Sequence, residues 1–182
     1  MLEEILVPFL AVGLAELGDK TQIALFCLSL KTNKRLQLLL GAIFAFIIVD
    51  GIAVILGSIF KTIVPHTIIK LGSGICFVVC GVLFMLRHEQ EHFKGNIRKP
   101  FLSGFGIVAL SEMGDKTQIA SGIFATRYDA YLVFIGVILV LSLLSIIAVF
   151  LGKVVLEKID ERTVPMLAGL LFIAIGLMTL IS

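Results

Sequence analysis

Charged residues are scarce in this chain, and tryptophan is absent. Asp, Glu, Lys and Arg make up 15% of the 182 residues, whereas 59% of the residues are hydrophobic. In a soluble domain, about a quarter of the residues are charged and about half are apolar. The mean hydropathy is +1.11. The shortage of charge therefore excludes an ordinary soluble domain and predicts an integral membrane protein.

Net charge and cysteine content are also low. The formal net charge is +2, which is too small to indicate a nucleic-acid partner. The three cysteines, Cys27, Cys76 and Cys80, all lie in apolar segments. Their number is odd, and a soft metal needs more ligands than Cys76 and Cys80 supply. We therefore predict that the cysteines are small packing residues.

The sequence is rich in long apolar runs. A helix needs about 20 mostly apolar residues to span a bilayer. Six segments satisfy this requirement: 5–29, 36–60, 64–86, 101–126, 130–152 and 163–181. Short polar or proline-containing segments separate them, and nothing is left over for a soluble domain. We predict an all-α membrane protein with six transmembrane helices, surrounded by the lipid bilayer.

Basic residues lie mostly on one side of this predicted bundle. The loops after spans 1, 3 and 5 hold ten Lys and Arg residues, whereas the other side holds Lys61, Lys70 and Arg127. The side richer in Lys and Arg is normally cytoplasmic. We therefore expect both termini to lie outside the cytoplasm.

One nine-residue motif occurs twice. ELGDKTQIA occupies 16–24 and EMGDKTQIA occupies 112–120, so the copies are 96 positions apart and differ at one residue. Each half has three spans, an odd number, so the second half enters the membrane from the opposite side. This predicts two inverted three-helix repeats, 1–86 and 101–182, joined by a cytoplasmic linker at 87–100 into one transport domain. Transporters of this kind bind their substrate near the midplane, between the repeats.

The motifs place acids in the middle of apolar spans. Glu16 and Glu112 each lie about twelve residues into a predicted span. A charged side chain at a helix centre costs roughly 2.5–3.5 kcal/mol on insertion scales. A duplication kept only for structure does not explain why these acids are duplicated. Ionisable residues at this depth indicate a functional site.

The spacing of the motif residues predicts a cation site. Glu16 and Asp19 are three residues apart, so a helix presents both on one face, and Gln22 extends that face by one turn. Facing copies would form a cage of oxygen atoms. The predicted ligands are Glu16, Asp19, Gln22, Glu112, Asp115 and Gln118. Thr21 and Thr117 can add hydroxyls. Oxygen ligands suit Mg²⁺, Ca²⁺ or Mn²⁺, and the lack of His and Cys argues against Zn²⁺ and Cu⁺.

The motif lysines and glycines each allow two interpretations. Lys20 and Lys116 lie four residues after the motif glutamates. They can form ion pairs that let the segment insert, or they can hold a carboxylate after the cation leaves. Gly18 and Gly114 can permit close helix packing. Alternatively, they can break the helix and expose backbone carbonyls to an ion, as in discontinuous transporter helices.

Asp50 breaks the symmetry of the repeat. It lies in the middle of the second span, and its counterpart in the other half, at an offset of 95, is Ser145. A buried carboxylate favours the protonated form, which suits a proton carrier. The alternative is a hydrogen-bonded structural acid.

Residues 88–92, His-Glu-Gln-Glu-His, match the formal H-E-x-x-H pattern of zinc proteases. They lie in the charged linker, where no third ligand is evident, so we expect a solvated segment. A membrane-bound zinc protease remains the enzymatic alternative. The change Glu89→Gln separates the two, because it abolishes a protease and leaves an antiporter unaffected.

The two motifs resemble the E-x-G-D-[KR]-[TS] signature of the second type of calcium/cation antiporter. That family includes bacterial manganese exporters and the Mn²⁺/Ca²⁺ transporters of the Golgi and the chloroplast. The matching residues are Glu16, Gly18, Asp19, Lys20 and Thr21, and Glu112, Gly114, Asp115, Lys116 and Thr117. The six-span plan covers essentially the whole chain.

The resemblance implies a transporter, not an enzyme. It implies export of Mn²⁺, or of Ca²⁺, from the cytoplasm across the inner cell membrane, in exchange for protons or another cation. The cation is cargo, so no resident cofactor is implied. The four motif acids, Glu16, Asp19, Glu112 and Asp115, would form its site. Asp50 and the linker histidines fall outside the signature.

Two further functions are compatible with the residues. A divalent-cation channel or uniporter can use the same acids as a selectivity site. An exporter of a small amino compound can also use acids, although we would then expect aromatic side chains around the site. Six short spans form a small unit, so a homo-oligomer is compatible with the sequence.

Overall fold

The computed structural model describes residues 2–86, 99–151 and 163–181, and its elements in this part of the chain are helices. They are α1 (Leu2–Glu16), α2 (Lys20–Ser29), α3 (Arg35–Ile63), α4 (His66–Leu86), α5 (Pro100–Glu112), α6 (Lys116–Arg127), α7 (Ala130–Ile146), the π-helical turn η1 (Ile147–Leu151) and α9 (Thr163–Ile181). The all-helical class predicted from the sequence is confirmed.

Local sequence signals account for several helix ends. Pro100 opens α5, where its missing N–H would have no partner in any case. The carboxylate of Asp129 caps α7 by accepting hydrogen bonds from the backbone N–H groups of Tyr131 and Leu132. The helix α3 ends at Ile63, and the next residue, Val64, is extended because Pro65 follows it.

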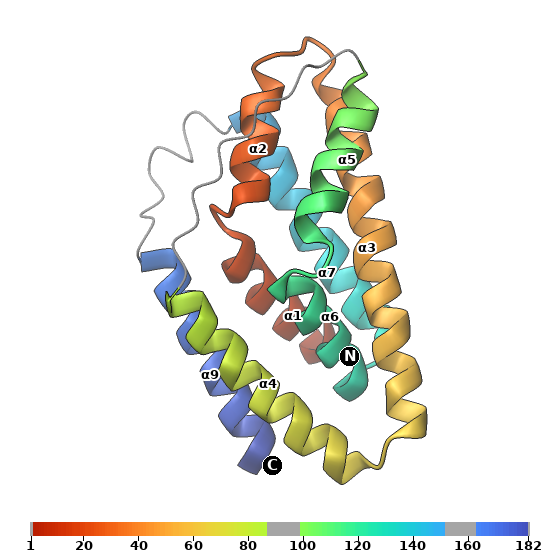
Figure 1. The fold of residues 1–182 in the computed structure, drawn as a ribbon, viewed down its shortest axis with the longest axis vertical. Coiled ribbons are helices and arrows are strands. Elements are labelled where there is room, and N and C mark those ends of the chain that lie inside the picture. Colours follow the sequence, from red (N-terminus) through yellow and green to blue (C-terminus); the bar gives the residue numbers. More distant parts are fainter. Residues whose placement is uncertain (1, 87–98, 152–162, 182) are drawn as a thin grey trace.

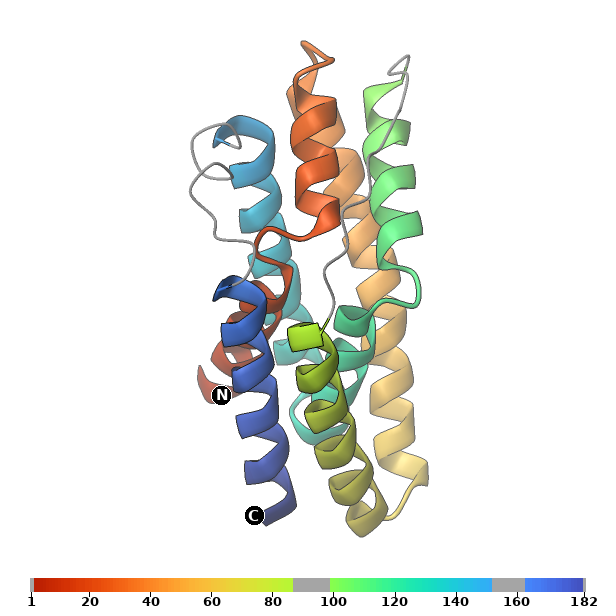
Figure 2. The ribbon, with the colours of Figure 1, turned by 60° about the vertical axis from the view of Figure 1, so that its left-hand side comes forward.

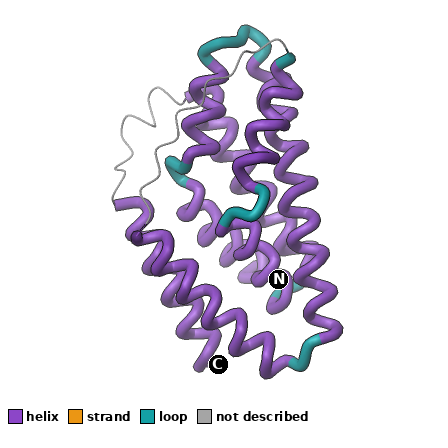
Figure 3. Tube along the Cα trace, in the orientation of Figure 1, coloured by secondary structure: helices purple, strands orange, loops and turns teal. Residues whose placement is uncertain are grey.

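Two of the predicted spans are interrupted. The segment 5–29 is divided into α1 and α2, and the segment 101–126 is divided into α5 and α6. Figure 3 shows both interruptions as short loops near the middle of the long axis. Two helices are long and apolar enough to cross a membrane by themselves: α3, with 29 residues, and the 22-residue run Ala130–Leu151. The other described helices are shorter or are divided by the interruptions.

The outer surface is apolar. Many large hydrophobic side chains are exposed, including Ile63 (74%), Leu110 (75%) and Met178 (71%). Soluble monomers rarely expose a contiguous apolar surface of this kind. Such a surface is what a helical bundle presents to lipid.

The two halves exchange their packing partners. The interrupted helix α1–α2 packs against α7 and η1, and the interrupted helix α5–α6 packs against α3. Figures 1 and 2 show that α3 and α7 run in opposite directions, as do the two interrupted helices. Each half therefore places its motif against the long helix of the other half. Additional contacts join α2 to α5 and α1 to α6.

Close glycine contacts hold α3 against the second interrupted helix. A methyl group added at Gly41 would collide with the carbonyl oxygen of Phe101 on α5, and one added at Gly57 would collide with that of Gly122 on α6. Small residues at such crossings let two backbones approach closely. One long helix can therefore support α5 and α6 on either side of the interruption.

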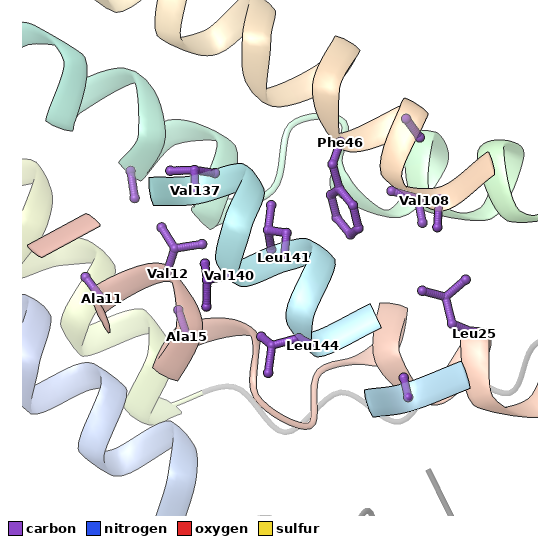
Figure 4. Packing of buried hydrophobic residues seen from close by; sticks show 14 of the residues in the cluster. Ala11, Val12, Ala15, Leu25, Phe46, Val108, Val137, Val140, Leu141 and Leu144 are labelled. Atoms are coloured by element: carbon purple, nitrogen blue, oxygen red, sulfur yellow. The ribbon is translucent and has the colours of Figure 1, made fainter. Parts of the chain in front are cut away.

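Apolar side chains fill the centre of the bundle. Figure 4 shows Val12 and Ala15 of α1 next to Val140 and Leu144 of α7. A second cluster joins α4, α6 and α9 through three buried rings, with 4.7 Å between the ring centroids of Phe77 and Phe124. Phe172 completes this cluster. The pair formed by α4 and α9 is thus anchored to the motif helix α6.

The turn between α6 and α7 ties together one end of the bundle. The ammonium group of Lys61 donates a hydrogen bond to the carbonyl oxygen of Tyr128 over 3.2 Å. The backbone N–H of Asp129 donates to Glu4 over 3.1 Å. Arg127 contacts Thr179 on α9. Lys61 and Arg127, which the charge pattern assigns to the same side, therefore meet at the same end.

Candidate functional site

Both motifs form a turn between two helices. Glu16 is the last residue of α1, and Asp19 is the N-cap of α2, with extended backbone angles. Gly18, between them, has a φ of +79°. Glycine adopts this left-handed conformation without the steric cost that other residues incur. The turn is closed by a 3.1 Å hydrogen bond from the N–H of Asp19 to the carbonyl oxygen of Glu16.

The second motif repeats this geometry. Gly114 also has a φ of +79°, and the N–H of Asp115 donates to the carbonyl oxygen of Glu112 over 3.0 Å. A methyl group added at Gly114 would meet nothing within 4 Å. The role of Gly114 is therefore to turn the backbone and not to allow close packing. The helix-breaking interpretation of this glycine is confirmed.

The turns show that the motif is not a continuous helix. We expected a continuous helix to present Glu16, Asp19 and Gln22 on one face, but the helix stops between the acids. The interruption brings the C-terminal end of one half-helix and the N-terminal end of the next to each acidic pair. Helix ends carry unpaired backbone groups and partial charges, which discontinuous transporter helices use to bind ions.

Three carboxylates converge between the two halves. One oxygen from each of Glu16, Asp19 and Asp115 lies within 4.8 Å of the others. The Glu16 side chain is 1% exposed. Each of the three carboxylates has one buried oxygen without a hydrogen-bond partner among the described residues: Glu16 Oε1, Asp19 Oδ2 and Asp115 Oδ2. Buried polar atoms normally have partners, and a bound cation would supply one to each of these oxygens.

Glu112 has different neighbours from Glu16, although the motif is repeated. The hydroxyl of Thr21 donates a 2.7 Å hydrogen bond to Oε1 of Glu112, and the hydroxyl of Thr117 donates to Oε2 over 3.3 Å. Thr21 belongs to the other half of the chain. Glu112, the fourth motif acid, thus accepts hydrogen bonds from two hydroxyls, and it is not a member of the three-carboxylate cluster.

An ion pair links the two motifs. The ammonium group of Lys116 lies 3.9 Å from Oδ1 of Asp19, and both side chains are about one-fifth exposed. The sequence suggested that each lysine pairs with the glutamate four residues earlier, a geometry that needs an unbroken helix. When ionised, the three clustered carboxylates and Lys116 leave two negative charges, which one divalent cation would neutralise. Lys20, the equivalent lysine, is half-buried.

The two motif glutamines differ. Gln22 is buried, with 4% of its surface exposed. Gln118 uses both ends of its amide: its oxygen accepts a 2.7 Å hydrogen bond from the N–H of Gly114, and its nitrogen donates to the carbonyl oxygen of Val49 over 3.2 Å. Gln118 therefore stabilises the second turn, and in this conformation its oxygen is not directed to the carboxylate cluster.

Asp50 reaches the motif region from α3. It is 1% exposed, and its Oδ1 lies 3.2 Å from the hydroxyl of Ser121 on α6. The same hydroxyl lies 2.9 Å from the carbonyl oxygen of Thr117. Sequence reasoning did not single out Ser121. A signal was available, because Ser121 is four residues after Thr117 in an otherwise apolar stretch.

Some predicted features lie outside this region or outside the described residues. Ser145, the counterpart of Asp50, is buried on α7, and its hydroxyl has no hydrogen-bond partner in the described part of the chain. The linker residues 88–92 are not among the described residues. Their histidine pattern is therefore not placed relative to the carboxylates.

Comparison with known proteins identifies relatives along nearly the whole chain. A family profile described as "Divalent cation/proton antiporter GDT1" matches residues 4–92 and 100–182. The "GDT1-like protein sll0615" of Synechocystis is 28% identical, over 94% of this chain and 94% of that protein. The "Putative manganese exporter" of Vibrio cholerae is 26% identical, over 95% of this chain and 88% of that protein.

A yeast relative matches a shorter segment. The "Divalent cation/proton antiporter GDT1" of Saccharomyces cerevisiae is 32% identical, over 43% of this chain and 28% of that protein. No solved structure was found to match the chain.

Proposed function

This chain belongs to the GDT1 family of divalent cation/proton antiporters, which are transporters and not enzymes, and from that premise we propose that it exports Mn²⁺ from the cytoplasm in exchange for protons. The observation that carries the proposal is the group formed by Glu16, Asp19 and Asp115, each of which has one buried oxygen without a hydrogen-bond partner among the described residues. These residues come from both motifs, so a cation bound to them would connect the two halves.

The chemistry of the cluster favours a hard divalent cation. Carboxylate oxygens suit Mn²⁺, Ca²⁺ and Mg²⁺, whereas Zn²⁺ and Cu⁺ sites normally include His or Cys. The name of the Vibrio cholerae relative supports Mn²⁺ as the physiological cargo. Ca²⁺ is the second cargo that we propose. Gln22 and Gln118 are further ligands that can enter the coordination shell as the site rearranges, and Glu112 could join them only after leaving the hydroxyls of Thr21 and Thr117.

For the architecture, we propose six spans arranged as two inverted repeats, 1–86 and 101–182, in the inner membrane. The opposite directions of α3 and α7 support it, as do the matching interruptions in the two halves (Figure 1). The interrupted helices, each packed on the long helix of the other half, suit alternating access, in which the halves rock around a central site. The distribution of the basic residues supports our proposal that both termini lie outside the cytoplasm.

Asp50 is the proton carrier in this proposal. The hydroxyl of Ser121 has one hydrogen and two acceptors within reach, the carbonyl oxygen of Thr117 at 2.9 Å and Asp50 at 3.2 Å. If the hydroxyl donates to the nearer carbonyl, Asp50 must supply its own proton to bond with Ser121. A protonated carboxyl group held in this way can release its proton and become a carboxylate when the charge of the cation site changes.

Ion flux in sealed proteoliposomes tests the proposed function. With an imposed proton gradient, Mn²⁺ and then Ca²⁺ are offered to the wild type and to the variants Asp19→Asn and Asp115→Asn. We expect metal movement with reciprocal proton flux in the wild type, and its loss in both variants. Glu3→Gln, which changes an exposed acid far along α1 from the motif, is the control and should retain flux.

Other outcomes favour other functions. Metal flux without proton movement would support the channel or uniporter. An absence of flux for both metals, or full activity in both variants, would contradict the site assignment. A metal-dependent peptidase activity abolished by Glu89→Gln would contradict the transporter altogether.

A further inference from the structure

The two equivalent glutamates, Glu16 and Glu112, have different neighbours. Glu16 lies in the three-carboxylate cluster, and its buried Oε1 has no hydrogen-bond partner among the described residues. Glu112 accepts hydrogen bonds from Thr21 and Thr117. The repeat would allow these two hydroxyls to hold either glutamate. In the observed conformation both hold Glu112.

From this asymmetry we propose that Thr21 and Thr117 are not cation ligands but a latch, which holds Glu112 away from the cation and leaves a site of three carboxylates. The inference rests on the proposed function and assigns the motif threonines a positioning role within it. Both threonines are 1% exposed, so water does not compete for their hydroxyls from bulk solvent. The latch joins the two halves directly, because Thr21 lies on α2 and Glu112 ends α5.

Two residues without an equivalent in the other half, Ser121 and Asp50, favour hydrogen bonding of the threonines to Glu112 over Glu16. The hydroxyl of Ser121 lies 2.9 Å from the carbonyl oxygen of Thr117 and 3.2 Å from Asp50. These contacts stabilise the first turn of α6, where Thr117 is located. The position equivalent to Ser121 in the first half is Leu25, and the position equivalent to Asp50 in the second half is Ser145. The first turn of α2 therefore lacks this polar support.

The latch sets the affinity for the cation. In the cation-free protein, two hydroxyl donors stabilise a buried carboxylate that would otherwise lack partners. Removal of the two hydroxyls therefore destabilises the cation-free protein. Glu112 then regains a partner only by binding to the cation. A fourth carboxylate also adds charge to the site, and cation affinity rises with the charge of the ligands. The latch thus keeps the cation bound weakly enough to be released.

A binding experiment on the purified full-length protein tests the latch, with Mn²⁺ as the probe in equilibrium dialysis. The variant Thr21→Val/Thr117→Val keeps the shape of both side chains and removes both hydroxyls. We expect it to bind Mn²⁺ roughly tenfold more tightly than the wild type and to transport it more slowly. The conservative pair Thr21→Ser/Thr117→Ser retains the hydroxyls and should bind Mn²⁺ with the wild-type affinity.

A third change separates a latch from a general structural effect. Adding Glu112→Gln to the valine pair should abolish the gain in affinity, because the gain requires the Glu112 carboxylate. The latch is contradicted if the valine pair binds Mn²⁺ no more tightly than the wild type, or if the gain persists with Glu112→Gln.

Single glutamate variants keep the proposal testable if the valine pair does not fold. With the latch present, Glu16→Gln should weaken Mn²⁺ binding at least tenfold more than Glu112→Gln does, since only Glu16 is in the cluster. Equal effects would overturn the latch while leaving the proposed function intact. If the wild type binds neither Mn²⁺ nor Ca²⁺, the proposed function itself is wrong.

Discussion

The ammonium group of Lys116, in the second motif, lies 3.9 Å from Oδ1 of Asp19, in the first motif. This ion pair crosses between the two halves at the edge of the carboxylate cluster. The lysine and a bound cation would interact with the same carboxylate. Lys116 is therefore in a position to hold Asp19 when the cation leaves, a role that the sequence left as one of two alternatives.

The change Lys116→Gln should strengthen cation binding and slow cation release. It removes a positive charge that repels the cation and pairs with Asp19. An ion pair of this partial exposure is worth up to about 1 kcal/mol, so we expect roughly fivefold tighter Mn²⁺ binding. Equilibrium dialysis measures the affinity, and proteoliposome flux measures the release. The matched variant is Lys20→Gln, and equal effects of the two changes would contradict a special role for Lys116.

The change Asp50→Asn should uncouple proton movement from metal movement. Asparagine keeps the shape of the side chain and can still contact Ser121, but it cannot release a proton. We expect Mn²⁺ binding close to that of the wild type, with Mn²⁺ flux that no longer responds to an imposed proton gradient. A pH-sensitive dye trapped in the vesicles measures the proton flux.

The symmetry-related change Ser145→Ala is the control for Asp50. It removes a buried hydroxyl that has no hydrogen-bond partner in the described part of the chain, so coupling should be unaffected. If Asp50→Asn retains full proton coupling, Asp50 is a structural acid and not the proton carrier.

Substitutions at Gly114 should separate backbone strain from packing. Its φ is +79°, and no atom lies near an added methyl group. Alanine in this conformation costs about 1–2 kcal/mol, whereas asparagine adopts it more readily. Thermal unfolding in detergent should therefore rank wild type, Gly114→Asn and Gly114→Ala in order of decreasing stability.

Gly106 provides the comparison for Gly114, because it lies within α5 and an added methyl group would also meet nothing. Alanine is more stable than glycine in the interior of a helix. Gly106→Ala should therefore raise the free energy of unfolding by about 0.5–1 kcal/mol. A Gly114→Ala protein as stable as the wild type would show that the left-handed turn is not required.

The change Gly57→Ala should separate α3 from α6. Its methyl group would collide with the carbonyl oxygen of Gly122, which is backbone and cannot move aside cheaply. Overpacking of this kind costs about 1–3 kcal/mol or more, and we expect a lower yield of folded protein and a lower unfolding temperature. Gly72→Ala on α4, where the methyl group meets nothing, should fold at least as well as the wild type. Equal behaviour of the two variants would contradict the close crossing.

Several properties could be predicted from the residues alone because they depend on local or summed features. Apolar runs and their lengths predicted helices at all six expected segments. The repeated motif identified the acids, and their oxygen chemistry indicated a hard divalent cation. The break at Gly114 was one of two interpretations, because a glycine in a sequence is equally suited to a turn and to close packing.

Other properties depended on contacts between residues distant in the chain. The two copies of the motif have nearly the same letters, so no local signal distinguishes Glu16 from Glu112. Only the packing of α2 against α5 directs Thr21 to Glu112, and only the crossing of α3 with α6 brings Asp50 to Ser121.

The sequence by itself determined the helical class, the family signature and the acids that can hold a cation, since these follow from composition and from spacing along one chain. The tertiary structure decided which three carboxylates meet, which fourth one is held by hydroxyls, and which lysine forms the ion pair across the halves. Those outcomes depend on distances of a few ångströms between separate helices, and a repeated sequence cannot specify an asymmetric site until its unrepeated neighbours are packed around it.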